Sequence, residues 1–465
     1  MCEGIAAELD GINLGDERLN KRSKVIIAAL AEAPELSINA SCDGWPETQA
    51  AYRFLDNERV DPEKIREPHI AATMARIRQH PVVLAVQDTT ELDYTLHPQK
   101  DARCLNSPKR HGLYVHPVLA VTPDRLMLGF LSSESFDRGE ESLGRTGERR
   151  TLPIEEKESF RWLKGYRTAT ATAQACPETL IVNVADREAD IYDIFVEAQK
   201  TEGIRAEYVI RAKEERSTLE RDPAAGASAY RKVSQEVAAS ECLATREIQL
   251  PETAKRAARL ATVEIRAKHF TVKPPHARSK LPAVSLNVVF VQEIGGPGDG
   301  TDVSWILLTT LPIDTVAEIE CVIQYYCARW TIEIYFRTLK TGCKVEQIQL
   351  ETLDRLKRCL AFYEIIAWRI LYLTYLNRTT PDVPCTTVFT SSEWKSVWTV
   401  VKREPLPKQT PRLNEIVQLV AQLGGYNNRT KDLPPGPQTL WIGLRKVSTL
   451  ALGWEAFGPE EQRCV

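Results

Sequence analysis

The sequence predicts a mixed α/β domain with a central sheet, flanked by helical segments at its two ends. Apolar runs of strand length begin near residue 81, and helical stretches at roughly 155–175 and 187–201 lie among them. Strands that cluster first and helices that are interposed later favour this class of domain. The expected strands cover residues 82–86, 117–121, 126–131, 180–184 and 208–210.

Residues 1–70 have a helical pattern. Asp16 is expected to cap a helix, and a second helix is expected at 47–55. The first helix groups its basic side chains at i, i+3 and i+4 spacing: Arg18, Lys21, Arg22 and Lys24. Because the segment is otherwise acidic, only this face is suited to a phosphate backbone. A charged helical hairpin without a ligand is the alternative.

Two acidic residues, Asp88 and Asp186, directly follow predicted strands. A charged residue in this position projects from the carboxyl end of the strand, where α/β sheets build their ligand sites. Asp93 competes with Asp88, but five residues further along a continued strand it would face the opposite side. For each aspartate taken alone, a role as a cap or turn residue remains open.

Residues 213–318 are rich in predicted strands, including 284–291 and 305–309, which flank a glycine-rich turn. The net charge of −3 gives no global signal for nucleic acid, but residues 253–281 contain eight Lys/Arg and one acid, Glu264. Local segregation of this kind favours a phosphate-binding surface. A disordered surface loop is the alternative.

Two long helices are expected at about 314–345 and 352–377. On the first, Tyr326, Arg329, Glu333 and Lys340 fall within an arc of about 60°. A carboxylate flanked by cations on one stripe suits a site that holds a metal and grips phosphates, although a solvated, salt-bridged face is equally open. The run 359–376 is expected to be a buried helix because Glu364 and Arg369 interrupt it.

The length of 465 residues predicts two to four domains. Eleven cysteines without a CxxC pair argue against a zinc site or a disulfide framework and fit a reducing cytoplasm. The N-terminus lacks the features of a signal peptide. Pro-rich breaks beyond residue 380 separate short helical pieces.

Asp88, Asp186 and Glu333 together supply what a two-metal phosphoryl-transfer site requires. Two Mg²⁺ ions, roughly 3.5–4 Å apart, are held by a few carboxylates, and water and substrate phosphate complete their coordination. Three acids from two strand ends and one helix therefore predict a metal-dependent phosphoryl-transfer enzyme, provided that the fold brings them together.

The motifs Asp88-Thr-Thr, Asp186-Arg-Glu-Ala-Asp190 and Tyr326-(2)-Arg329-(3)-Glu333-(6)-Lys340 resemble the signatures of DDE transposases of bacterial insertion sequences. The chain is similar to the insertion-sequence-four (IS-four) family, which includes the Tn-five transposase. Residues 14–22 and 49–57 resemble the N-terminal region of that family, and residues 424–426 and 434–441 resemble its C-terminal part.

The resemblance implies an α/β, ribonuclease-H-like catalytic core interrupted by a β-rich insertion, with helical N-terminal and C-terminal domains. It implies domains at 1–70 (DNA-end binding), 71–377 (catalytic, with an insertion at about 213–318) and 378–465 (dimerisation). Asp88, Asp186 and Glu333 would be catalytic and would bind Mg²⁺ or Mn²⁺, two ions per site. The implied DNA-binding residues are Tyr326, Arg329, Lys340, Arg337, Arg211, Trp305, Arg18, Lys21 and Arg22, with Trp305 stacking on or replacing a flipped base.

The expected function is cut-and-paste transposition through a hairpin at the transposon end. The expected partners are double-stranded DNA, as terminal inverted repeats and target, and a second copy of the chain. A catalytically inactive, transposase-derived DNA-binding regulator is the alternative, which the intact acids disfavour. A junction resolvase is a third possibility, disfavoured by the long insertion and Trp305.

Overall fold

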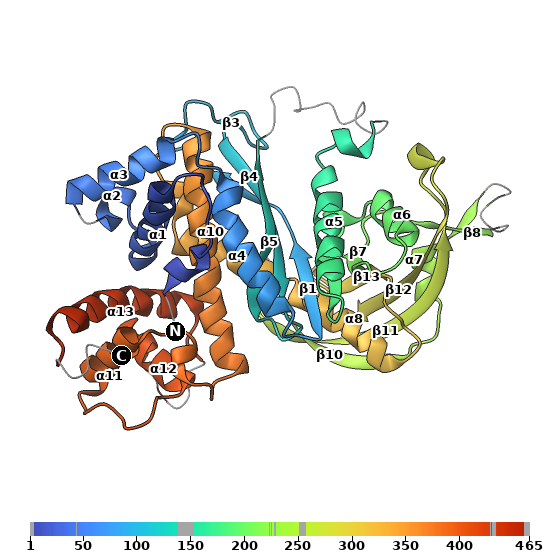
Figure 1. The fold of residues 1–465 in the computed structure, drawn as a ribbon. Helices are drawn as coiled ribbons and strands as arrows, with labels where there is room; N and C mark the ends of the chain where they lie inside the picture. The colour runs from blue at the N-terminus through green and yellow to red at the C-terminus, as the bar shows by residue number, and fades with distance from the viewer. Residues whose placement is uncertain are drawn as a thin grey trace.

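The computed structural model describes residues 4–459, apart from residues 43, 138–151, 223, 225, 227–228, 251–256, 428 and 430–433. Helices form the N-terminal part (Figure 1), as expected. Asp16 caps the first long helix by accepting a hydrogen bond from the Arg18 N–H. The bounds are η1 Ile5–Leu9, α1 Glu17–Glu32, α2 Ile38–Ser41, α3 Gly44–Asp56 and α4 Pro62–Ile77.

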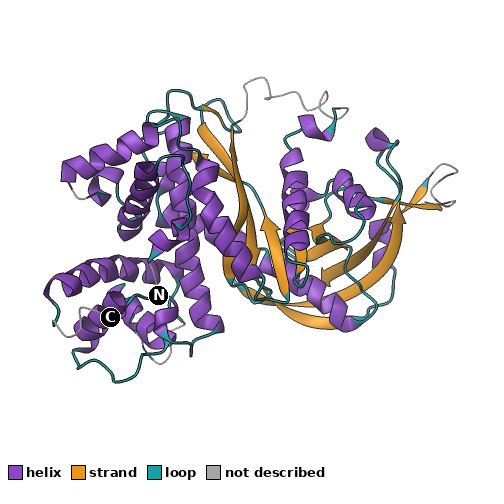
Figure 2. Cartoon of the chain, in the orientation of Figure 1, coloured by secondary structure: helices purple, strands orange, loops and turns teal. Residues whose placement is uncertain are grey.

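A mixed sheet runs through the middle of the molecule (Figure 2). Its first part has the strand order β5-β4-β1-β6-β7, in which β1 pairs antiparallel with β4 and parallel with β6, and β6 pairs parallel with β7. Helices α5 (Phe160–Ala175) and α6 (Tyr192–Lys200) precede β6 and β7, as expected. The strands are β1 Val82–Gln87, β2 Thr90–Asp93, β3 Arg103–Cys104, β4 His111–Val121, β5 Met127–Phe136, β6 Leu180–Ala185 and β7 Glu207–Arg211.

The β-rich stretch after β7 continues this sheet. Strand β13 pairs antiparallel with β7, with Leu307 opposite Arg211, and β12 and β11 extend the sheet further. Residues 259–272 form β11, so the interpretation of this basic stretch as a disordered loop is wrong, while Lys255 and Arg256 lie outside the described residues. The elements are β8 Ser217–Arg221, β9 Tyr230–Lys232, α7 Val233–Ala238, β10 Ala244–Leu250, β11 Arg259–Val272, β12 Val284–Glu293 and β13 Ser304–Thr309.

The helix expected at 314–345 is divided into three pieces: α8 (Val316–Ala328), α9 (Thr331–Arg337) and a π-helical turn (Thr338–Gly342). At the first division the hydrogen bonds tighten to i−3: the Arg329 N–H donates to Tyr326 at 3.1 Å, and the Ile332 N–H donates to Arg329 at 3.1 Å. The prediction of one uniform helix is wrong, because hydrophobic periodicity does not report a local change in hydrogen-bond spacing.

Helix α10 (Leu353–Thr379) has the length and hydropathy of a membrane-spanning helix, but 89% of its most apolar window is buried in the fold. The prediction of a buried helix is therefore confirmed. Helices α11 (Ser391–Lys402), α12 (Leu413–Leu423) and α13 (Pro437–Phe457) follow it and pack together below the N-terminal helices in Figure 1. One apolar core extends from the N-terminal helices through the sheet to α13.

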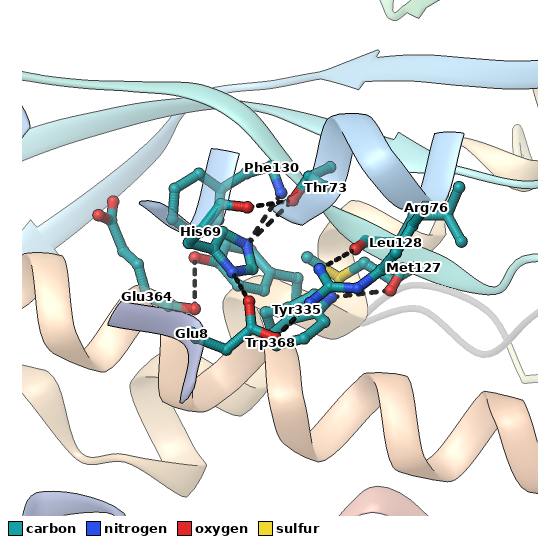
Figure 3. Close-up of polar contacts among 10 residues, drawn as sticks. All are labelled: Glu8, His69, Thr73, Arg76, Met127, Leu128, Phe130, Tyr335, Glu364 and Trp368. Atoms are coloured by element: carbon teal, nitrogen blue, oxygen red, sulfur yellow. Dashed lines mark hydrogen bonds and ion pairs between the residues drawn. The ribbon is translucent and has the colours of Figure 1, made fainter. Parts of the chain in front are cut away.

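A buried polar network ties the N-terminal part to this core (Figure 3). Glu8 of η1 pairs with Arg76 of α4 and with the Nδ1 of His69, which lies 2.6 Å away. The Phe130 N–H donates to His69 Nε2 at 3.4 Å, so Nδ1 carries the proton that is donated to Glu8. Burial lowers the pKa of His69, although Glu8 opposes the shift.

Candidate active site

Asp88 and Asp186 leave neighbouring strands at the same edge of the sheet. In the parallel pair of β1 and β6, Val86 lies opposite Val184, and each aspartate follows two residues later. The register of the sheet therefore brings Asp88 and Asp186 to the same edge of the sheet. Asp186 caps the short helix η5 (Arg187–Ala189), and Asp88 Oδ1 accepts the Thr89 N–H at 2.8 Å.

Arg329, at the end of α8, joins Asp88 to Glu333 of α9. Its Nη1 lies 3.0 Å from Asp88 Oδ2, and its Nη2 lies 2.6 Å from Glu333 Oε1. The Arg329 side chain is 9% exposed, whereas that of Glu333 is 51% exposed. Burial opposes the charge of the guanidinium, but Tyr326 and the two carboxylates outweigh it and raise the pKa of Arg329. One cation therefore holds two of the three predicted acids together.

The electrostatics of Asp88 show that Asp186 is also close. Burial and the Asp186 carboxylate raise the pKa of Asp88 to about 7, against the opposing effect of Arg329. Like charges that share a site raise a carboxyl pKa in this way. Asp93 ends β2, and its carboxylate pairs with Arg110 at 2.9 Å. The choice of Asp88 over Asp93 as the metal ligand stays a prediction.

Tyr326 and Trp305 form the aromatic wall beside this cluster. Burial raises the pKa of the Tyr326 phenol, while Arg329 and a hydrogen bond with Arg211 oppose the shift. Arg211 also donates to the carbonyl of Ser304 at 3.2 Å. Trp305 is 6% exposed and packs edge-on against Tyr326 and Trp330, with ring centroids 5.2 and 6.4 Å away. The indole is thus part of the core in this structure, and stacking on a base requires it to be uncovered.

Lys340 and Arg337 interact with residues other than the three predicted acids. Lys340 lies on the π-helical turn, which has more residues per turn than an α-helix, and its Nζ is 4.0 Å from Glu346. Arg337 is exposed, and together with Arg378 and Arg125 it opposes the effect of burial that raises the pKa of Tyr375 on α10. The charge of Arg337 therefore acts on a residue of α10.

The basic face predicted on α1 is partly neutralised by ion pairs. Arg22 pairs with Glu47 of α3, and Lys24 pairs with Asp10. The side chains of Arg18 and Lys21 are 92% and 78% exposed, and within the part of the chain that the structure describes each pairs only with an acid near the start of its own helix. These two side chains are accessible to a phosphate backbone.

Three known protein families match successive parts of the chain. The family described as Transposase DNA-binding matches residues 1–60, Transposase DDE domain matches residues 166–368, and Transposase Tn5 dimerisation domain matches residues 365–456. The chain is a Tn5-like DDE transposase. The matches support DNA binding, dimer formation and a transposase activity, and the DDE domain implies a ribonuclease-H-like fold for the core of this transposase.

The predicted acids suit the divalent cations that DDE transposases use, because Mg²⁺ and Mn²⁺ prefer oxygen ligands. Within the described ranges, no three His, Cys, Asp or Glu side chains are arranged so that they could hold one metal ion. The reason at Asp88 and Glu333 is visible: both carboxylates point to the guanidinium of Arg329. Carboxylate oxygens suit such a cation, but the guanidinium of Arg329 lies between the carboxylates of Asp88 and Glu333.

Asp190, the last residue of the motif that begins at Asp186, has a role that the sequence did not reveal. Its Oδ2 accepts the N–H groups of Lys213 and Glu214, both at 2.8 Å, and its Oδ1 pairs with the buried Arg216. Asp190 therefore ties the turn after Asp186 to the chain that leaves β7 just after Arg211. In the sequence, only the position of Asp190 in the motif drew attention to this residue, because its partners lie more than 20 residues away.

Proposed function

We propose that this transposase carries out cut-and-paste transposition with Asp88, Asp186 and Glu333 as the ligands of two Mg²⁺ ions. The observation that supports the proposal is the bridge between Asp88 and Glu333 through Arg329, beside a strand register that brings Asp186 to the same edge. Two of the three carboxylates share one buried cation, an arrangement that supports a functional site because burying charge costs on the order of several kcal/mol unless it is paired.

The reactions are in-line displacements at phosphorus, so one site can perform them in turn. Water cuts the 3′ end of the element, and the freed 3′-hydroxyl attacks the opposite strand to form a hairpin. A second water opens the hairpin, and the 3′ ends then join target DNA. When bound, the metal ions would supply activation of the attacking oxygen and stabilisation of the leaving oxygen.

The chain's own residues would hold the DNA in this site. Arg329 has a planar fork of donors that suits a phosphate, and Tyr326 and Arg211 adjoin it. Lys340 and Arg337 would contact phosphates further along the same helical segment. Trp305 would take the place of a flipped base, at the cost of leaving its contacts with Tyr326 and Trp330.

Each of the proposed domains would have its own role in this reaction. Residues 1–70 would bind the terminal inverted repeats through the face of Arg18, Lys21 and Arg22. Residues 71–377 would form the catalytic domain, whose β-rich insertion at about 213–318 covers the DNA end. Residues 378–465 would join two copies in the synaptic complex. The protein would act in the bacterial cytoplasm, where its DNA substrate lies.

The test is cleavage of a duplex that carries the terminal inverted repeat, which can be identified from the DNA flanking the gene. Glu333→Gln in Mg²⁺ is expected to abolish nicking. A matched control is Glu320→Gln, because Glu320 is also a partly exposed glutamate with an arginine partner, Arg246. Nicking by Glu333→Gln at the rate of the control variant would show that the metal assignment is wrong.

A further inference from the structure

The guanidinium of Arg329 is held as if in place of a metal ion. It is buried, and it donates to one oxygen of Asp88 and one oxygen of Glu333, which are two of the three proposed metal ligands. Its Nε is also buried, and among the described residues it has no hydrogen-bond partner. A buried donor without a partner requires an explanation, such as an acceptor that arrives with a ligand.

Hydrogen bonds from Arg329 and coordination bonds to a metal ion would compete for the carboxylates of Asp88 and Glu333. Arginine-to-carboxylate hydrogen bonds are charge-assisted, and they occupy oxygen lone pairs that a metal would need. A fixed positive charge about 3 Å from those oxygens also repels a dication, and the repulsion is strong where solvent screening is weak. Metal binding by Asp88 and Glu333 therefore requires Arg329 to leave them.

We propose that Arg329 is an internal counter-ion that keeps the acids paired in the DNA-free transposase and releases them when a DNA phosphate takes its guanidinium. This inference rests on the proposed function, because it takes Asp88 and Glu333 to be metal ligands. Glu333, whose side chain is 51% exposed, is the more accessible of the two partners of the buried Arg329, and the Arg329 Nε gives a phosphate a further donor once the guanidinium leaves the acids. Metal loading is thereby made conditional on DNA.

This coupling would restrict hydrolysis to a site that already holds a DNA end. Without DNA and metal, carboxylates gathered at one site repel one another. Arg329 offsets this repulsion without providing a catalytic metal. An arginine suits this role better than a lysine, because its planar fork can donate to two carboxylates at once, whereas a lysine is a point charge.

The experiment measures Mn²⁺ binding to the full chain by the loss of the free-ion paramagnetic resonance signal, with and without a duplex carrying the terminal repeat. The variants are Arg329→Gln, which removes the charge, and Arg329→Lys, which keeps it but cannot bridge the acids. Arg167→Gln is the control, because Arg167 also pairs with a carboxylate through two nitrogens, at 2.7 Å each, far from these acids in sequence. Thermal unfolding of each variant checks that it is folded.

For the DNA-free protein, Arg329→Gln is expected to bind Mn²⁺ at least about tenfold more tightly than the wild type, with Arg329→Lys between them. DNA should tighten Mn²⁺ binding by the wild type and by Arg167→Gln, but not by Arg329→Gln. Equal or weaker binding by folded Arg329→Gln, in a protein whose Mn²⁺ binding still depends on Glu333, would overturn the counter-ion role alone. If Glu333→Gln leaves Mn²⁺ binding unchanged in the DNA complex as well, the metal site of the proposed function also fails.

Discussion

Arg66 of α4 and Glu364 of α10 form an ion pair that is closed off from solvent: Arg66 Nε lies 2.7 Å from Glu364 Oε2, and each side chain is 1% exposed. Ser133 of β5 donates to the other oxygen of the same carboxylate. The Tyr335 hydroxyl, two residues from Glu333, donates to the Glu364 carbonyl at 3.4 Å. The pair therefore connects the N-terminal helices, the sheet and the helix that carries Glu333.

Glu364→Gln is expected to destabilise the transposase by roughly 3–5 kcal/mol, because it removes the buried partner of the Arg66 charge and leaves only the mainly exposed Glu63 to pair with it. The measurement is the free energy of unfolding in urea. Glu197→Gln is the matched control: it breaks a more exposed pair with Arg167 and should cost no more than about 1 kcal/mol. Equal losses in the two variants would mean that burial of the Arg66 pair has no energetic consequence.

Asp190→Asn is expected to loosen the chain that follows β7. The substitution removes the charge that pairs with Arg216 and one of the oxygens that accept hydrogen bonds. Amide hydrogen exchange at Lys213 and Glu214 should become faster, because these N–H groups donate to the Asp190 carboxylate. Glu188→Gln, in the same motif but with a 57% exposed side chain, should leave both exchange rates as they are. Unchanged protection in Asp190→Asn would contradict the tethering role.

The pKa of Asp88 predicts a specific dependence of stability on pH. Burial and Asp186 raise this pKa to about 7 in the folded protein, from an unperturbed value of about 3.8 in the unfolded chain. Between pH 4 and 7 the folded protein keeps a proton that the unfolded chain releases, so Asp88 makes the fold less stable as the pH rises. Above pH 7 the effect is constant.

Asp88→Asn removes this effect. In DNA-free, metal-free protein, the variant's stability relative to the wild type should increase with pH from about 4 to about 7, by at most about 1.4 kcal/mol per pH unit. Urea unfolding at a series of pH values measures the difference, and the other titrating groups largely cancel between the two proteins. A difference that stays flat over this range would show that the Asp88 pKa is not raised.

Arg18 and Lys21 are expected to contribute to DNA-end binding through phosphates. The double variant Arg18→Gln, Lys21→Gln should reduce the slope of log K against log salt concentration by about 2, since each phosphate contact adds roughly 0.9. Lys100→Gln with Arg412→Gln is the control, because both side chains are mainly exposed and neither lies on α1. If the control pair lowers the slope as much, the α1 face has no special role.

Local patterns in the sequence predicted much of the fold. Alternation and apolar runs indicated β1, β6, β7, β12 and β13 to within a residue or two at most ends, because short buried strands between turn residues have a strong local signal. The same patterns located the Asp16 cap and the buried helix α10. The positions of Asp88 and Asp186 after parallel strands were predictable for the same reason.

The remaining features depend on a change of hydrogen-bond spacing within a helix and on contacts between distant residues. The i−3 hydrogen bonds near Arg329 and the π-helical turn at Lys340 changed the stripe that an ideal helix predicts, because helical periodicity assumes one spacing throughout. Trp305 is buried against Tyr326 and Trp330, and Arg22 forms an ion pair with Glu47. Neither change has a local signal in the sequence.

The sequence by itself determined which acids follow strands and which cations lie near Glu333 in the chain, because strand patterns and residue spacing are local properties of the chain. Only the tertiary structure decided that Arg329 would bridge Asp88 and Glu333, and that Asp190 would tether the chain after β7. The pairing of Asp88 with Arg329 and those of Asp190 join residues that the fold alone brings within hydrogen-bonding distance, 241 positions apart for Asp88 and Arg329.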